Sequence, residues 1–299
     1  EVNIKTNAGV IIKNLFGGGD AGNTTGNIII DTSANIENLY SGANQANVGG
    51  NISLTINGGT VGNAFGGNNV SGIINGNVDV VINSGTISNL YGAGNQASDD
   101  YKTTIKINNG NVSELYGGGL EASVGSTEIV VVNGIIGSIY GGGYAGNVDS
   151  TTKVTINGGQ ISGNIYGGGY AGTVNSTTVE LNDSNNPGYL TVNGSVFGGG
   201  EGKTASVYLS TNVIINLQLE MLVTETAFTT DTISGKSEVK AEITSSKYSK
   251  ILGNVYGGGD LGQVGVGSIN ASTNTATIQQ AGKSTVLITN GYIEGCNNK

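Results

Sequence analysis

Apolar and polar residues alternate along short stretches of this chain, and the stretches recur. In residues 152–156, Val154 and Ile156 fall on one face of an extended strand and the polar residues between them on the other. A period of two is typical of a strand with one buried face. The same alternation appears at residues 52–56 and 105–107. We therefore expect short, half-buried strands repeated along the chain.

An aliphatic residue, then Tyr or Phe, then usually a run of glycines follows most of these stretches. Successive aromatics lie 24 to 26 residues apart up to Tyr166, and the next two steps are 31 and 59 residues. A repeat of this length without a helical unit predicts coils that stack on one another. The aromatics are Phe16, Tyr40, Phe65, Tyr91, Tyr116, Tyr140, Tyr166, Phe197 and Tyr256.

Each repeat contains three short apolar arms separated by Asn-Gly, Gly-Gly and Ala-Gly pairs, which mark turns. We predict an all-β fold, a single-stranded parallel β-solenoid with three sides, about 25 residues per coil and roughly ten coils. One coil cannot bury its own apolar edge, whereas a stack of coils closes a continuous core. Right-handed winding is expected because parallel crossovers have that hand.

The repeat pattern is broken after Phe197, and this break divides the chain. Alternation at Val239, Ala241 and Ile243 indicates an inserted strand or hairpin that projects from the rod. Smaller insertions, at residues 183–189 and 265–283, lengthen their coils. The expected parts are solenoid coils over residues 1–207, irregular coils with the insertion over 208–250, and terminal coils over 251–299.

A polar residue, nearly always Asn, follows the first arm of the coil. Asn tolerates the backbone angles of a bend, and its amide can both donate to and accept from the same amide one coil away. We predict a ladder that stabilises the turns, with a ligand site at these positions as the alternative. The ladder residues are Asp31, Asn57, Asn83, Asn108, Asn133, Asn157, Asn182 and Asn290.

The composition excludes several kinds of chemistry. The 299-residue chain has no histidine, the commonest metal ligand and general base, and its 12 basic residues are all lysines. A net charge of −9 argues against nucleic acid and anionic membranes as partners. No apolar segment is long enough to span a bilayer. We expect no cofactor, no metal, no nucleic-acid partner and no membrane span.

Paired carboxylates remain as a route to catalysis, because solenoid enzymes that cut polysaccharides use Asp and Glu. Acidic residues do not recur at one position of neighbouring coils. Asp99 and Asp100 lie on a turn, and Asp20 and Asp260 follow glycine runs in distant coils. We therefore expect no enzyme activity.

Two groups of residues are candidates for contact with a glycan or a protein partner. Tyr144 and Tyr170 directly follow the glycines in adjacent coils, where we expect them to be exposed. Lys236, Lys240 and Lys247 gather in the predicted insertion, and loops on a rigid scaffold often carry function. The alternatives are aromatic packing at the core edge and a solvated surface decoration.

Ser and Thr recur before the first arm and could form a row of hydroxyl groups. The runs are Thr103-Thr104, Ser126-Thr127, Ser150-Thr151-Thr152, Ser176-Thr177-Thr178 and Ser284-Thr285. An ice-binding face would need a flat and regular threonine array. This row is mixed, so we interpret it as a solvated turn that starts the strand.

The end of the sequence carries two smaller expectations. Cys296 is the only cysteine, so no intrachain disulfide can form, and we favour an incidental thiol over an intermolecular bridge. The chain begins and stops inside the repeat pattern, so we expect a mature form or a piece of a longer protein.

The YGGG-type repeat, rich in glycine and asparagine, resembles the β-solenoid repeats of large cell-surface proteins of Gram-positive gut bacteria and, more loosely, adhesin and autotransporter stalks. The resemblance implies a secreted or wall-attached bacterial rod for adhesion, spacing or assembly. Its partners would be copies of itself, end to end or side by side, or a host or cell-surface glycan or protein. A carbohydrate-binding or polysaccharide-cleaving β-helix and an ice-binding solenoid are the alternatives.

Overall fold

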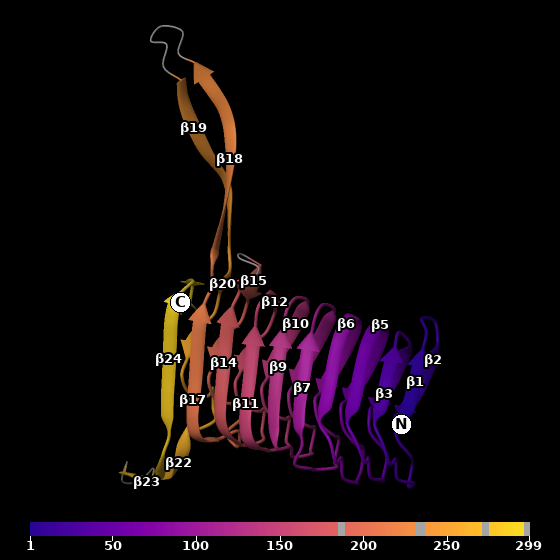
Figure 1. The fold of residues 1–299 in the computed structure, drawn as a ribbon. Helices are drawn as coiled ribbons and strands as arrows, with labels where there is room; N and C mark the ends of the chain where they lie inside the picture. Colours follow the sequence, from indigo (N-terminus) through magenta and orange to yellow (C-terminus); the bar gives the residue numbers. More distant parts are fainter. Residues whose placement is uncertain (185–188, 231–236, 271–274, 296–299) are drawn as a thin grey trace.

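The chain winds as a parallel β-solenoid, which confirms the predicted fold class (Figure 1). The computed structural model describes residues 1–184, 189–230, 237–270 and 275–295, and the regular elements in them are all strands. About seven turns have the regular length of about 25 residues, fewer than the roughly ten predicted, because the later turns contain insertions.

The first arms form one long parallel face. Each strand pairs with the equivalent strand one turn before and after it; Val154, for example, lies opposite both Ile129 and Val179. In the described residues, ten strands follow one another in this face. They are β1 (Val2–Thr6), β3 (Ile28–Thr32), β5 (Ile52–Phe65), β6 (Val78–Tyr91), β7 (Lys102–Ile107), β9 (Ser126–Val131), β11 (Val148–Ile156), β14 (Val174–Asn182), β17 (Val207–Asn216) and β24 (Lys283–Asn290).

The second arms form another parallel face, and isolated bridges such as Val124 with Val148 hold a short third side. Strands β5 and β6 run through both the first and the second arm. The other second-arm strands are β2 (Ile11–Phe16), β4 (Asn35–Tyr40), β8 (Asn111–Tyr116), β10 (Ile135–Tyr140), β12 (Gly159–Ile161), β13 (Ile165–Tyr166), β15 (Leu190–Val192), β16 (Val196–Phe197), β20 (Lys250–Ile251), β21 (Val255–Tyr256) and β25 (Tyr292–Ile293).

The predicted alternation places the core inside the turns. Val154 and Ile156 are fully buried, whereas Lys153 between them is exposed. Because each turn repeats this arrangement one rung further along, Ile, Val and Leu side chains fill the interior as one continuous cluster from Ile28 to Ile251. Stability therefore comes from contacts between adjacent turns.

Equivalent positions in successive turns form columns along the rod. One such column of the core changes from aliphatic to hydroxyl side chains. Val78 lies opposite Thr103, and Thr127, Thr152 and Thr177 continue the column, all almost fully buried. Our interpretation of this row as a solvated turn was wrong for these threonines. The strand already begins before them, and the first inward position of its alternation falls on the threonine.

These buried hydroxyls bond to the corner glycines of their own turn. Thr103 Oγ1 donates to Gly117 O at 2.8 Å, and Thr127 Oγ1 donates to Gly141 O at 2.6 Å. A buried carbonyl without a donor costs free energy, so each threonine satisfies a polar group at the corner.

The repeated aromatics form a stack that is separate from the aliphatic core. The residue before each aromatic points into the turn, so the ring itself lies on the other side of the strand. Ring centroids of neighbouring turns are 4.7 to 5.0 Å apart, with interplanar angles of 4° to 10°. The rings from Phe65 to Phe197 are buried, and Tyr256 at the far end is 43% exposed.

The predicted insertion is an antiparallel hairpin that projects from the rod (Figure 1). It consists of β18 (Leu219–Thr230) and β19 (Ser237–Tyr248), which lie within the predicted 208–250 region, and β17 before it is still a regular rung. The 265–283 insertion is a second hairpin, β22 (Gly265–Asn270) and β23 (Thr275–Ala281). Cys296 and Lys236 lie outside the described residues.

Candidate functional site

The predicted asparagine ladder is present in the N-terminal turns. Asn57 Nδ2 donates to Asp31 Oδ1 at 2.7 Å, Asn83 Nδ2 to Asn57 Oδ1 at 2.7 Å, and Asn108 Nδ2 to Asn83 Oδ1 at 2.8 Å. Within the described residues, these amide-to-amide bonds stop at Asn108. The remaining predicted positions, whose amides join no neighbouring amide there, are Asn133, Asn157, Asn182 and Asn290.

Two further amide ladders flank the aromatic stack, and our sequence reasoning missed both. Their side-chain bonds are 2.6 to 3.0 Å long. The signal was available, because an Asn stands two residues before the aromatic in four successive repeats. One ladder runs through Asn14, Asn38, Asn63 and Asn89, and the other through Asp20, Asn44, Asn69 and Asn95.

Tyr144 and Tyr170 continue the second of these columns in later turns. Their rings stack on each other at 4.7 Å, and each also makes an edge contact with the aromatic stack, at Tyr116 and Tyr140 respectively. Tyr144 is 38% exposed, as expected, whereas Tyr170 is only partly exposed. The pair therefore covers the aromatic stack, and its contact with a partner stays a prediction.

Glu201 occupies the same column one turn further on. Its Oε2 accepts a hydrogen bond of 2.5 Å from the Tyr140 hydroxyl. Burial raises the pKa of Tyr140, and the bond to Glu201 raises it further. Burial also raises the pKa of Tyr91 to about 12, and burial together with the negative charge of Glu201 raises the pKa of Glu114. These phenols thus stay protonated at neutral pH, which removes them as bases.

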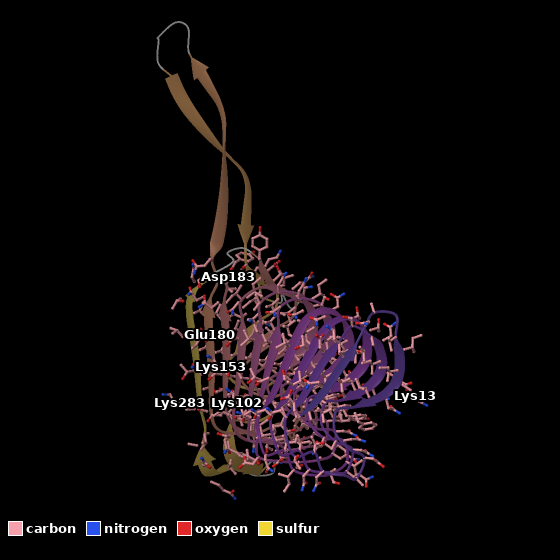
Figure 2. All side chains as sticks on the ribbon, turned by 45° about the vertical axis from the view of Figure 1, so that its right-hand side comes forward. Lys13, Lys102, Lys153, Glu180, Asp183 and Lys283 are labelled. Atoms are coloured by element: carbon pink, nitrogen blue, oxygen red, sulfur yellow. The ribbon has the colours of Figure 1, made fainter. Side chains whose placement is uncertain are left out.

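A buried carboxylate lies at the base of the long hairpin (Figure 2). Asp183 is fully buried, and its Oδ1 accepts a 2.7 Å hydrogen bond from the Gln218 N–H, directly before β18. Its Oδ2 accepts from the Ser249 hydroxyl, directly after β19. Ser249 Oγ in turn accepts from the Leu190 N–H at 2.9 Å. One side chain therefore joins both legs of the hairpin to the rod.

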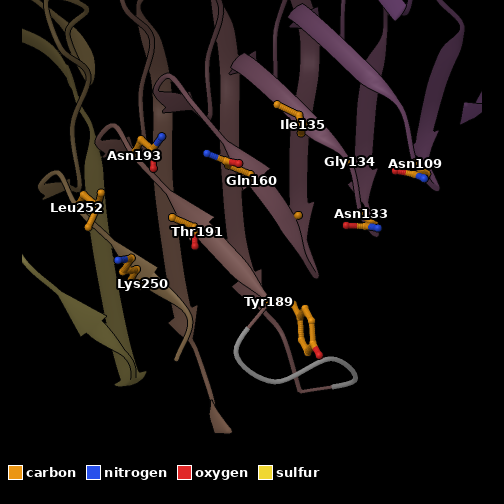
Figure 3. Close-up of a pocket in the computed structure, with 11 residues that line it drawn as sticks. Asn109, Asn133, Gly134, Ile135, Gln160, Tyr189, Thr191, Asn193, Lys250 and Leu252 are labelled. Carbon is orange, nitrogen blue, oxygen red and sulfur yellow. The ribbon is translucent and has the colours of Figure 1, made fainter. Parts of the chain in front are cut away.

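An open groove of about 570 Å³ lies beside this network, on the outer side of the second arms (Figure 3). Its floor is one register column, in which Ile135 lies opposite Gln160, Gln160 opposite Thr191, and Thr191 opposite Lys250. The described residues that line it are Asn109, Asn133, Gly134, Ile135, Gly159, Gln160, Tyr189, Thr191, Asn193, Lys250 and Leu252.

Two glycines and Tyr189 shape this groove. Gly134 and Gly159 have φ angles of 120° and 89°, which L side chains rarely adopt, so no side chain fills the space at these bends. Tyr189 is the last residue of the predicted 183–189 insertion and is 47% exposed. The Tyr189 carbonyl accepts a hydrogen bond from the Gly159 N–H at 3.1 Å, which ties Tyr189 to the wall of the groove.

The amides in the groove differ from those in the ladders. In the described part of the chain, the side chains of Asn133, Gln160 and Asn193 make no hydrogen bond. They therefore keep both donor and acceptor capacity toward solvent or a ligand.

Other functional features are few among the described residues. No group of three or more His, Cys, Asp or Glu side chains is placed to hold a metal ion there. No helix long and apolar enough to cross a membrane is found in that part of the chain either. Lys240 and Lys247 lie in β19, and Lys236 is outside the description, so a contact role for these lysines stays a prediction.

The fold and its ladders define a class, the β-solenoids with stacked asparagines. No known family model matches the chain, and no significantly similar curated protein or solved structure was found.

Proposed function

We propose that this chain is a non-catalytic structural and adhesive rod on the surface of a bacterial cell or secreted from it. The observation that carries the proposal is the continuous stack of rungs from β1 to β24, in which the core and the aromatic stack run through successive turns. Such an array resists local unfolding because every turn is held by its neighbours. A rigid scaffold of this kind suits spacing and display.

The projecting hairpin and the groove are the parts suited to contact. The hairpin and one end of the groove lie where turns depart from the regular length, and the Asp183 network fixes both relative to the rod. Association of copies belongs to the same proposal, because β1 and β24 pair on one side only in the described structure, and an unpaired strand edge can accept another strand.

The proposal is tested by adhesion and by microscopy. Beads coated with the chain should adhere to a glycoprotein-coated surface, and a variant in which a short Gly-Ser linker replaces residues 219–248 should adhere less. Electron micrographs should show rods that join end to end at high concentration. The proposal would be contradicted if coated beads adhered no better than uncoated beads and the micrographs showed only separate rods.

A carbohydrate-binding β-helix is the second candidate, and the unused amides of the groove favour it over a cleaving enzyme. The buried threonine column weakens the ice-binding alternative, because Thr103, Thr127, Thr152 and Thr177 face the core and not the solvent. Incubation with polysaccharides in the presence of calcium, followed by mass analysis of products, distinguishes binding from cleavage.

A further inference from the structure

We propose that the groove of Figure 3 binds an acidic oligosaccharide that lies along the rod axis. This inference rests on the proposed adhesive function and adds to it a ligand class and a position. Three properties of the groove support it: its length, its charge and its hydrogen-bonding groups.

The length of the groove suits an extended chain. Its lining comes from five successive turns, from the one that contains Asn109 to the one that contains Lys250. At about 4.8 Å per rung, four steps between turns span roughly 19 Å. A single sugar would occupy only part of this length, so several linked units are needed to fill it.

The charge of the groove favours an anionic ligand. The chain carries a net charge of −9, yet the eleven lining residues that the structure describes include a lysine, Lys250, and no carboxylate. An anion therefore meets less repulsion here than over the acidic parts of the surface. One lysine suits a few carboxylates and not the dense phosphates of a nucleic acid.

The hydrogen-bonding groups match sugar hydroxyls. Asn133, Gln160 and Asn193 offer amides that the protein itself does not use, and Thr191 adds a hydroxyl. Ile135 is 50% exposed on the floor and presents an apolar surface to the face of a sugar ring. An extended peptide fits less well, because the floor strands are already paired on both edges and cannot form new main-chain bonds.

The Asp183 network holds one end of the groove. Ser249 directly precedes Lys250, and its hydroxyl bonds to the Leu190 N–H next to Tyr189. Tyr189 and Lys250 therefore lie next to residues that are fixed by buried hydrogen bonds. These bonds pre-organise this end of the groove for a ligand.

Calorimetric titration of the full chain with oligogalacturonate, and with neutral galacto-oligosaccharide of the same length, tests the assignment. The acidic oligomer should bind more tightly, longer oligomers better than short ones, and added salt should weaken the binding. Lys250→Gln should lower its affinity about tenfold. The matched control is Lys106→Gln, which removes the same charge from an exposed site on the first-arm face and should change little.

Gln160→Glu is the variant that preserves size and fold. It places a carboxylate on the floor and should weaken binding of the acidic oligomer much more than binding of the neutral one, which loses only the amide donor of Gln160; thermal unfolding should match that of the unmodified chain. The inference is overturned by absent saturable binding, by equal binding of the neutral oligomer, or by equal losses in Lys106→Gln and Lys250→Gln. Cleavage of the oligomer would contradict the non-catalytic function and leave the groove assignment intact, whereas retained bead adhesion without oligomer binding would contradict the assignment alone.

Discussion

The N-terminal turns, residues 28–91, and the later turns, residues 102–256, share one backbone plan but use their polar side chains differently. In the N-terminal turns, amides bond to amides one rung away, and the inward column that begins each strand is aliphatic. In the later turns that column consists of threonines whose hydroxyls bond to corner carbonyls. The amide ladders end in these turns, and insertions interrupt the repeat.

The N-terminal turns satisfy their own polar side chains, whereas the later turns have polar side chains that can bind other molecules. Where amides satisfy one another, the surface offers little free hydrogen-bonding capacity. Where the ladders end, the groove amides at Asn133, Gln160 and Asn193 have no partner in the described structure, and the hairpins emerge. We infer that contact with other molecules concentrates in the later turns.

The aromatic stack gives the largest expected effect. Burial raises the pKa of Tyr116, Tyr140 and Tyr166 above the ordinary value of 10.0, and that of Tyr91 to about 12. The unfolded chain loses these protons near pH 10 while the folded chain keeps them, so stability is full below pH 10 and falls as the pH rises toward and beyond 12.

Ultraviolet absorbance and circular dichroism, followed together during an alkaline titration, check this prediction. Ionisation of these tyrosines should coincide with loss of β structure. Tyr40 lies between two phenylalanines in the N-terminal turns, and Tyr40→Phe should leave the transition nearly unchanged. Ionisation of all 13 tyrosines near pH 10 with the fold intact would contradict the burial of the stack.

Removing the buried carboxylate at the base of the hairpin should have the next largest effect. Asp183→Ala leaves the Gln218 N–H and the Ser249 hydroxyl without their acceptor, at a cost of about 3 kcal/mol or more in the free energy of unfolding. Hydrogen exchange should rise first in β18 and β19. Unchanged exchange there would show that the network does not anchor the hairpin.

The inward column provides a reciprocal pair of substitutions. Thr152→Val keeps the shape but leaves the Gly167 carbonyl without the Thr152 hydroxyl, which should cost about 1 to 3 kcal/mol in unfolding free energy. Val78→Thr supplies a donor near the equivalent corner carbonyl of Gly92, so its cost should be below about 1 kcal/mol. Chemical denaturation measures both. Equal costs would mean that the two regions do not differ at this column.

The asparagine ladder predicts a smaller difference between two equivalent positions. Asn83→Ala removes a bond to Asn57 and one from Asn108, both at exposed sites, and should cost about 1 kcal/mol. Asn157→Ala removes no amide-to-amide bond and should be nearly neutral. Denaturant midpoints compare the two variants, and a larger loss at Asn157 would reverse the interpretation.

The smallest effect is expected at Glu114. Its raised pKa means that the folded chain binds the proton more tightly than the unfolded chain, so this residue lowers stability as the pH rises above about 4.5. Glu114→Gln should therefore stabilise the chain at neutral pH, by less than about 1 kcal/mol after allowance for solvent screening, and not below pH 4.5. Thermal unfolding at two pH values tests this sign.

The fold was predictable because its signal repeats. A regular aromatic spacing and a period of two in the strands fix both the turn length and the buried face, and each repeat confirms the others. The threonine column was harder to interpret, because a shift of one residue moves a side chain from solvent to core. Our interpretation therefore placed the Thr127 side chain in solvent, whereas it faces the core.

The site was less predictable because it depends on irregular turns. Asp183, Gln218 and Ser249 are far apart in the sequence, and only the lengths of two insertions bring them together. The groove likewise needs Tyr189 and Lys250 to arrive beside Gln160 from different turns. No local sequence pattern indicates which residues of different turns meet in space.

The uniform turn length also has a mechanical consequence. Neighbouring turns are joined by rows of hydrogen bonds, so tension between the two ends of the chain would peel away one turn at a time, starting at an end rung. Each released turn of about 25 residues would lengthen the tether by roughly 80 Å. The rod would then lengthen in discrete steps under force, with the longest step at the turn that contains the hairpin.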